Sequence, residues 1–333
     1  MSIKNKQVLL ASRPVGWPQA SNFQLVETEL PEPGENEVLV KNLYLSLDPY
    51  MRGRMDDAKS YSAKVELGDV MVGGTVGEVV TSNHPRFQVG EQVVGYFGWQ
   101  QYGVSHGRGL NKIDPAAGLP ISAYLGPVGM PGVTAYYGLM NIGQPVPGET
   151  VVVAAAAGAV GSVVGQMAKL KGCRAVGIAG GKAKCDYVVQ ELGFDACIDY
   201  KAGNLYQDLK AATPDGIDIY FENVGGEILD TVLRRLNPFA RIPLCGLISG
   251  YNDTQPRGIV NYRMLLVSRV KLEGFIVSEH MEVWPQALSD LGQWVAEGKV
   301  KYHETIAEGL ENAPAAFIGL LQGKNFGKQL VKL

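Results

Sequence analysis

The first part of the chain, up to about Pro127, has the hydrophobic pattern of short β-strands. Apolar and β-branched residues alternate with polar ones over residues 37–45, 75–80 and 91–96, and turns rich in Gly, Pro, Asn and Asp separate these runs. Glycines crowd residues 73–77 within strand-like sequence, which is typical of close backbone approach or sharp bending. We therefore predict a mostly β domain built as a partly open barrel.

From about Val128 the pattern changes to apolar strands that alternate with segments of helical period. Strands are predicted over residues 151–154, 175–179, 196–199, 217–221, 241–245 and 271–276. Helices are predicted over residues 158–171, 182–192, 204–212, 225–236 and 281–297. Six strands joined by helical crossovers predict a doubly wound parallel sheet, so the fold class is α/β and this domain is expected over residues 128–303.

The turn after the first of these strands has the composition of a dinucleotide-binding motif. Ala156, Gly158 and Gly161 stand where G-x-G-x-x-G is usual. Gly158 would let the backbone approach a pyrophosphate, and Gly161 would let the helix pack closely on the strand. With Ala159 and Val160, the turn would place the phosphates over N–H groups at a helix N-terminus. Many turns carry glycines for packing alone, but the flanking strand and helix favour the cofactor interpretation.

The end of the second strand bears on which dinucleotide is bound. An NAD site normally places an acidic residue there for the ribose hydroxyls. This chain has no acid there and instead runs Gly180, Gly181, Lys182, Ala183, Lys184. A lysine at that point can pair with a 2′-phosphate, so the cofactor is expected to be NADP(H). The alternative is that the two lysines only solvate the start of the next helix.

Residues that follow the later strands are candidates for the rest of a cofactor site, because ligands of such sheets bind beyond the carboxyl ends of the strands. Glycine or small polar residues occur within each of the segments 223–226, 246–251 and 276–278. Any one of these segments is more simply an ordinary turn. As a set, they favour contact with a flat cofactor.

Composition narrows the other classes of function. The 333 residues carry a net charge of −3 with no basic stripe, which argues against a nucleic-acid partner. No apolar run is long enough to span a membrane and no signal-peptide pattern is present, so we expect a cytoplasmic protein. The four cysteines form no C-x-x-C pair and the four histidines are scattered, so no metal site is expected.

Several motifs occur together along nearly the whole chain. They lie at residues 45–55 (LSLDPYMRGRM), 129–136 (GMPGVTAY), 155–162 (AAAGAVGS), 221–226 (FENVGG), 245–249 (CGLIS) and 323–328 (GKNFGK). In this combination the chain resembles the zinc-independent medium-chain dehydrogenase/reductases. Within them it is most similar to the branch of leukotriene B4 dehydrogenase/prostaglandin reductase and the NADPH-dependent curcumin reductases.

The resemblance implies a GroES-like β domain of residues 1–127 and 304–333, an NADP-binding Rossmann domain, and a homodimer. It implies that Lys184 and Tyr200 bind the 2′-phosphate end and that Tyr50 and Tyr61 face the substrate. Further cofactor-binding residues implied by the resemblance are Thr134, Asn223, Cys245, Gly246, Leu247, Ile248, Ser249, Tyr251, Phe275, Ile276, Val277 and Asn325.

The resemblance also indicates the chemistry. Zinc-dependent relatives need a cysteine and a histidine in the β domain, but this chain has no cysteine before Cys173. Without a metal, a carbon–carbon double bond conjugated to a carbonyl is the natural hydride acceptor. The expected activity is NADPH-dependent reduction of α,β-unsaturated ketones and aldehydes, with Tyr50 as a candidate donor to the carbonyl oxygen. The alternatives are an NADPH quinone reductase and a non-catalytic NADPH-binding protein.

Overall fold

The computed structural model describes residues 4–333, and the chain divides into two compact units. The first unit holds the described residues up to Leu125 together with the C-terminal segment from Glu304 to Leu333. The second unit runs from Gly126 to His303. Each unit has its own sheet and its own buried core.

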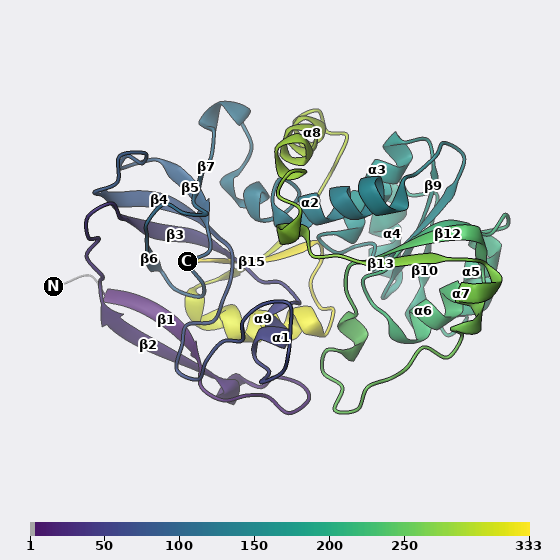
Figure 1. Ribbon diagram of the computed structural model, residues 1–333, viewed down its shortest axis with the longest axis horizontal. Helices are drawn as coiled ribbons and strands as arrows, with labels where there is room; N and C mark the ends of the chain where they lie inside the picture. Colours follow the sequence, from purple (N-terminus) through teal and green to yellow (C-terminus); the bar gives the residue numbers. More distant parts are fainter. Residues whose placement is uncertain (1–3) are drawn as a thin grey trace. The chain divides into compact units, whose positions relative to one another are not determined.

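The first unit is mostly β, as predicted. Its strands and helices are β1 (Lys4–Leu10), β2 (Phe23–Glu29), β3 (Val38–Ser46), α1 (Met51–Arg54), β4 (Thr75–Ser82), β5 (Gln92–Gly95), β6 (Tyr102–Ser105), β7 (Asn111–Lys112), β14 (Glu304–Glu308), α9 (Ala313–Leu321) and β15 (Lys328–Lys332). One edge of β3 pairs with β4, while the opposite edge is shared by β6 and β15. Figure 1 shows β15, in yellow, beside β3. The last strand of the chain is thus part of the sheet formed by the N-terminal strands.

Aromatic packing also holds the C-terminal segment in this unit. The ring of Trp99 stacks on Phe23 with centroids 5.5 Å apart, and Phe317 of α9 meets Trp99 edge-on at 5.6 Å. Trp99 and Phe317 are fully buried. Such ring pairs contribute about 0.5–1.5 kcal/mol each beyond the area that they bury. Helix α9 therefore supplies core side chains that the N-terminal strands lack.

The second unit contains the predicted doubly wound sheet. Its elements are α2 (Met130–Tyr137), a π-helical turn (Gly138–Gly143), β8 (Thr150–Ala154), α3 (Gly161–Leu170), β9 (Arg174–Ala179), α4 (Lys182–Gln190), β10 (Ala196–Asp199), α5 (Leu205–Ala212), β11 (Ile217–Phe221), α6 (Gly226–Leu233), β12 (Leu236–Leu244), α7 (Arg263–Val267), β13 (Lys271–Gly274) and α8 (Trp284–Ala296). The six strands are parallel, in the order β10-β9-β8-β11-β12-β13. The winding reverses between β8 and β11, which is where such sheets bind ligands.

Alternate residues of β8 face two helical layers. Val151 and Val153 lie in one core cluster with residues of α2, α3 and α8, whereas Val152 and Ala154 lie in another with residues of α6. All four side chains are fully buried. A strand covered on both faces reads as a continuous apolar run, which is why residues 151–154 gave so clear a signal.

Several predicted boundaries are wrong. The predicted helix over 158–171 begins at Gly161, because the turn before it contains Ala155 in the left-handed region, at φ 52°. The predicted helix over 225–236 ends at Leu233, and β12 starts at Leu236, earlier than the predicted 241. The early start of β12 is followed by a bulge between Leu236 and Arg241, where the register with β11 shifts. The bulge includes Phe239, at φ 65°.

Candidate functional site

The turn between β8 and α3 has the close backbone approach that the glycine pattern predicts. A Cβ atom on Gly161 would lie 2.4 Å from the carbonyl oxygen of Ala155, a separation that real side chains do not tolerate. The amide of Gly158 donates to that same carbonyl at 2.9 Å, and the amide of Ser162 donates to the carbonyl of Gly158 at 3.0 Å. The turn is therefore tight, and α3 begins directly behind it with its N-terminal dipole toward the turn.

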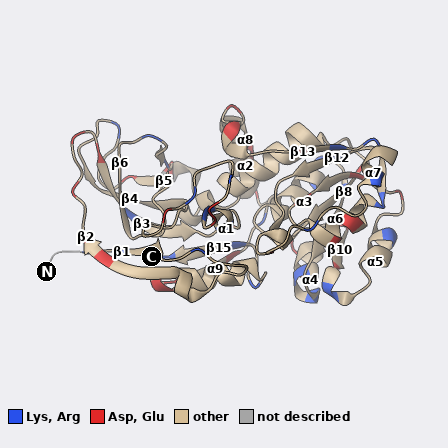
Figure 2. Ribbon diagram, turned by 60° about the horizontal axis from the view of Figure 1, so that its bottom comes forward, with Lys and Arg blue, Asp and Glu red and all other residues tan. Residues whose placement is uncertain are grey.

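Basic side chains gather at the end of β9, which the sequence assigns to the 2′-phosphate. Tyr200 covers Gly180 so closely that a Cβ there would lie 2.9 Å from the tyrosine hydroxyl. The pKa of Lys184 is lowered first by burial and then by the nearby charge of Lys201. Asp199 accepts the amides of Gly181 at 2.7 Å and of Lys201 at 3.0 Å, and so fixes this turn. Figure 2 shows the basic residues of α4 in blue.

Lys184 and Lys201 are close enough for their charges to repel each other. A phosphate dianion between them would offset this repulsion. Lys201 was not among the predicted cofactor residues. Lys201 directly follows Tyr200 in the sequence, and this position could have indicated it. A lysine after a strand is, however, too common to be singled out as a cofactor residue.

The segments that follow β11 and β12 are hydrogen-bonded to each other. The amide of Ile248 donates to the carbonyl of Asn223, and that of Ser249 donates to the carbonyl of Val224 at 3.0 Å. The amide of Leu247 donates to the hydroxyl of Tyr251 at 3.2 Å. Asn223 in turn donates to the carbonyl of Ala154 at 2.8 Å. The structure therefore brings the predicted residues 223 and 245–251 together at the carboxyl end of the sheet, next to β8.

Glu222 links the segments that follow β11 and β12. Its side chain is fully buried, and its Oε1 accepts the backbone amides of Val224 and Gly225, at the start of α6. Burial raises the pKa of this carboxyl from 4.5 to about 7, against the opposing effect of those amides. The carbonyl of Glu222 also accepts the amides of Cys245 and Gly246. Sequence reasoning missed this residue, because an acid after a buried strand looks like an ordinary surface position.

Three predicted cofactor residues have side chains in the core. Phe275 packs against the ring of Tyr137 with centroids 5.4 Å apart, and Val277 lies in the same buried cluster. The hydroxyl of Thr134 donates to the carbonyl of Met130 at 2.7 Å, one turn back in α2. The side chains of Phe275 and Val277 therefore belong to the buried core of the second unit.

In the first unit, Tyr50 lies immediately before α1 with its hydroxyl buried. Its pKa is raised well above the ordinary value of 10, first by burial and then by Tyr96 and Asp48. The guanidinium of Arg54 lies 5.6 Å from the ring centre of Tyr50 and 4.4 Å from that of Tyr61. The two predicted tyrosines thus flank one buried arginine, although the Tyr61 side chain is 54% exposed.

A buried ion pair supports this tyrosine cluster. The ammonium of Lys328 in β15 lies 2.6 Å from a carboxylate oxygen of Asp48 and also donates to the carbonyl of Leu47. Both side chains are almost fully buried, and Ser46 donates its hydroxyl to Asp48. The C-terminal strand therefore fixes the loop that carries Tyr50.

Tyr96 and Arg54 are the residues of this cluster that sequence reasoning missed. Tyr96 follows β5 and is 67% exposed. Arg54 is buried and donates to the carbonyl of Ser62 at 3.0 Å. The sequence signal for Arg54 was its position four residues after Tyr50, but nothing along the chain indicates that Tyr96 lies nearby.

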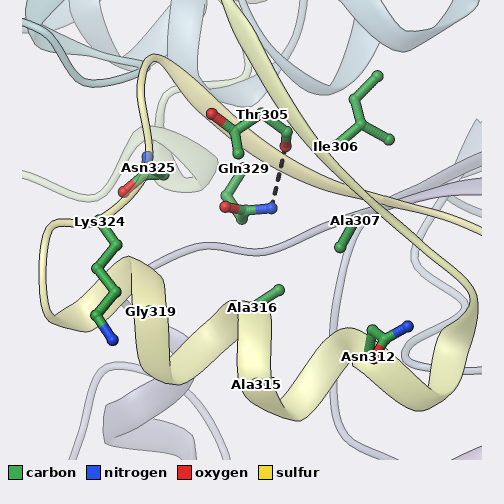
Figure 3. A pocket seen from close by; sticks show the side chains of 10 residues that line it. All are labelled: Thr305, Ile306, Ala307, Asn312, Ala315, Ala316, Gly319, Lys324, Asn325 and Gln329. Atoms are coloured by element: carbon green, nitrogen blue, oxygen red, sulfur yellow. Dashed lines mark hydrogen bonds between the residues drawn. The ribbon is translucent and has the colours of Figure 1, made fainter.

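Asn325 lies in the first unit, between α9 and β15, where its amide donates to the carbonyl of Gly327 at 2.8 Å. It lines a pocket of about 300 Å³ that Figure 3 shows from close by. The pocket is formed by Thr305, Ile306, Ala307, Asn312, Ala315, Ala316, Gly319, Lys324, Asn325 and Gln329. Small residues of α9 form one wall of the pocket, while half of its lining residues carry polar side chains.

Residues 4–333 contain neither a metal-binding cluster nor a helix suited to span a membrane. No three His, Cys, Asp or Glu side chains in this range come together as a metal ion would require. None of the helices in the same range is both long and apolar enough to cross a membrane.

The sequence is similar to known oxidoreductase families and proteins over nearly its whole length. Residues 6–113 match the family described as the N-terminal domain of oxidoreductase, and residues 159–293 match the family described as zinc-binding dehydrogenase. The NADPH-dependent curcumin reductase of Escherichia coli (strain K12) is 52% identical over 99% of this chain and 97% of its own length. The chain belongs to the medium-chain dehydrogenase/reductases.

Other members of this family are similar over nearly their whole length. The 2-alkenal reductase (NADP(+)-dependent) of Nicotiana tabacum is 44% identical over 99% of this chain and 97% of its own. The crystal structure of CurA in complex with NADPH from Vibrio vulnificus has a TM-score of 0.93 and 53% identity over 98% of each chain. The resemblance to the curcumin, prostaglandin and alkenal reductase branch is thereby confirmed.

Proposed function

We propose that this protein uses NADPH to reduce the carbon–carbon double bond of α,β-unsaturated ketones and aldehydes. The observation that carries the choice of cofactor is the pair Lys184 and Lys201 beside Tyr200, at the end of β9, where NAD enzymes place an acid. The full-length similarity to reductases of curcumin and 2-alkenals supports the same substrate class.

The residues present fit NADPH. A Cβ atom would lie 2.4 Å from the carbonyl oxygen of Ala155 on Gly161 and 3.1 Å from it on Gly158, so the turn is tight. It precedes the N-terminus of α3, where a pyrophosphate would bind. Lys184 and Tyr200 would hold the 2′-phosphate. Ala159 and Val160, with the two glycines, would hold the pyrophosphate. We assign the ribose and nicotinamide to the remaining predicted residues: Thr134, Asn223, Cys245, Gly246, Leu247, Ile248, Ser249, Tyr251, Phe275, Ile276, Val277 and Asn325.

When bound, NADPH supplies a hydride to the β-carbon of the substrate. Negative charge then develops on the substrate carbonyl oxygen, and a donor aimed at that oxygen stabilises it. The raised pKa of Tyr50 keeps its hydroxyl protonated at neutral pH, so Tyr50 donates a hydrogen bond and is not a base. Arg54 holds the rings of Tyr50 and Tyr61, and the exposed Tyr61 covers the substrate.

The test is NADPH oxidation with a panel of conjugated enones and enals, compared with benzoquinones. We expect turnover of the enones, with saturation of the double bond seen in the product by mass spectrometry. Faster turnover of quinones would replace the proposal with a quinone reductase. Tight NADPH binding with no turnover of any acceptor would indicate a non-catalytic NADPH-binding protein.

We further propose that the protein works without zinc in the cytoplasm. The first cysteine of the chain is Cys173, so the first unit offers no thiolate to a metal. The four cysteines are unbridged, as is usual in a reducing compartment. Stoichiometric zinc in the purified, active protein would contradict the first statement.

A homodimer is the proposed assembly. Strand β13 is at one edge of the parallel sheet and, among the described residues, pairs only with β12. Apolar side chains in the segment that leads into β13 are exposed, including Val260, Tyr262 and Leu266. An open edge beside an apolar surface is a ready site for pairing with a second copy. Light scattering should give twice the chain mass, and Leu266→Lys should shift the protein toward monomer.

A further inference from the structure

Two thiols meet beneath the phosphate end of the cofactor site. The Sγ atoms of Cys185, in the first turn of α4, and Cys197, in β10, are 3.0 Å apart, with the Cys197 thiol donating to Cys185. A disulfide bond is about 2.05 Å long, so the sulfurs need to approach by about 1 Å. Neither cysteine is bridged in this structure. We propose that Cys185 and Cys197 are a redox modification site that closes reversibly into an intramolecular disulfide.

The pair is partly accessible to solvent through Cys197. Cys185 is 8% exposed, while Cys197 is only partly buried. Cys197 pairs with Gly177 of β9, and the missing side chain there leaves its sulfur space. Burial raises the pKa of both thiols, so the reaction is slow at neutral pH and becomes faster as the pH rises.

The oxidant that we invoke is a low-molecular-weight disulfide such as oxidised glutathione. Two S–H bonds of the protein break and one S–S bond forms. The two protons and two electrons released reduce the small disulfide to two thiols, so the exchange is balanced and a dithiol reverses it.

Closure would act on the 2′-phosphate residues, and this part rests on the proposed NADPH site. Lys184 is adjacent to Cys185, and Asp199, two residues after Cys197, holds the amides of Gly181 and Lys201. Drawing the first turn of α4 toward β10 changes the spacing of the two lysines. NADPH affinity should fall about tenfold, the effect of weakening one contact, while NADH affinity stays the same.

The chain offers a direct assay for the bond. Trypsin cleaves after Lys184 and Lys201, so both cysteines lie in one peptide of residues 185–201. After treatment of the full-length protein with oxidised glutathione, this peptide should lose two hydrogens and resist alkylation. Cys173 and Cys245 should remain alkylatable, and the control Cys173→Ser should behave like the wild type. Cys185→Ser and Cys197→Ser should each abolish the modification.

Binding measurements then test the consequence, with calorimetry of NADPH and NADH on reduced, oxidised and dithiol-treated protein. Full alkylation of the peptide after oxidation, or disulfides only between chains, would overturn the modification site. A disulfide that leaves NADPH affinity unchanged would overturn its link to the cofactor. Reduced protein that binds no NADPH would refute the proposed function instead, because the peptide mass reports the disulfide independently.

Discussion

The buried carboxyl of Glu222 makes a prediction about stability and pH. A rise of its pKa from 4.5 to about 7 means that the folded state holds this proton more tightly than the unfolded state does. Stability is therefore highest below about pH 4.5 and falls as the pH rises to about 7, after which it is level with respect to this group. At about 1.4 kcal/mol per pKa unit, the loss amounts to about 3 kcal/mol.

Glu222→Gln removes this titration and keeps an oxygen that accepts the amides of Val224 and Gly225. We expect the free energy of unfolding of the variant, relative to that of the wild type, to rise by about 3 kcal/mol between about pH 4.5 and about pH 8. The assay is urea unfolding followed by tryptophan fluorescence at both pH values. Other titrating groups are common to both proteins and cancel in the difference.

Glu227→Gln is the matched control, because Glu227 is exposed in the first turn of α6. The difference between this control and the wild type should be nearly the same at both pH values. If Glu222→Gln behaved in the same way, the carboxyl would titrate alike in the folded and unfolded states. The argument that burial dominates over its two amide partners would then be wrong.

Further predictions concern the cofactor and the tyrosine cluster. Lys184→Gln should raise the Kd of NADPH at least about tenfold, because a charge-assisted contact contributes about 1.5–3 kcal/mol, and should leave the Kd of NADH unchanged. Calorimetry measures both constants. Lys182→Gln, at an exposed lysine, should change neither. Tyr50→Phe should lower kcat with enones about a hundredfold with little change in NADPH binding, and equal kcat values would exclude Tyr50 as the donor. Lys328→Met leaves the buried charge of Asp48 unpaired and should destabilise the protein by about 3–5 kcal/mol in denaturant unfolding; an unchanged midpoint would contradict that.

The sequence by itself determined the parts of this protein whose physics is local. The apolar run of β8, the small residues of the turn and the helical period of α3 are contiguous, so residues 151–170 predicted the strand and helix that the structure contains, and with them a phosphate site. The lack of an acid after β9 indicated the cofactor for the same reason. Helix and strand boundaries were less certain, since Phe239 and Ala155 adopt left-handed backbone conformations that their side chains do not favour.

Only the tertiary structure decided which distant residues meet. Tyr96 approaches Tyr50 and Lys328 pairs with Asp48 because segments far apart in the chain are neighbours in the fold. Cys197 meets Cys185 because α4 packs on β10. Burial is likewise a property of the whole fold: the carboxyl of Glu222 has a raised pKa because strands and helices surround it, and nothing in the adjacent sequence encodes that surrounding.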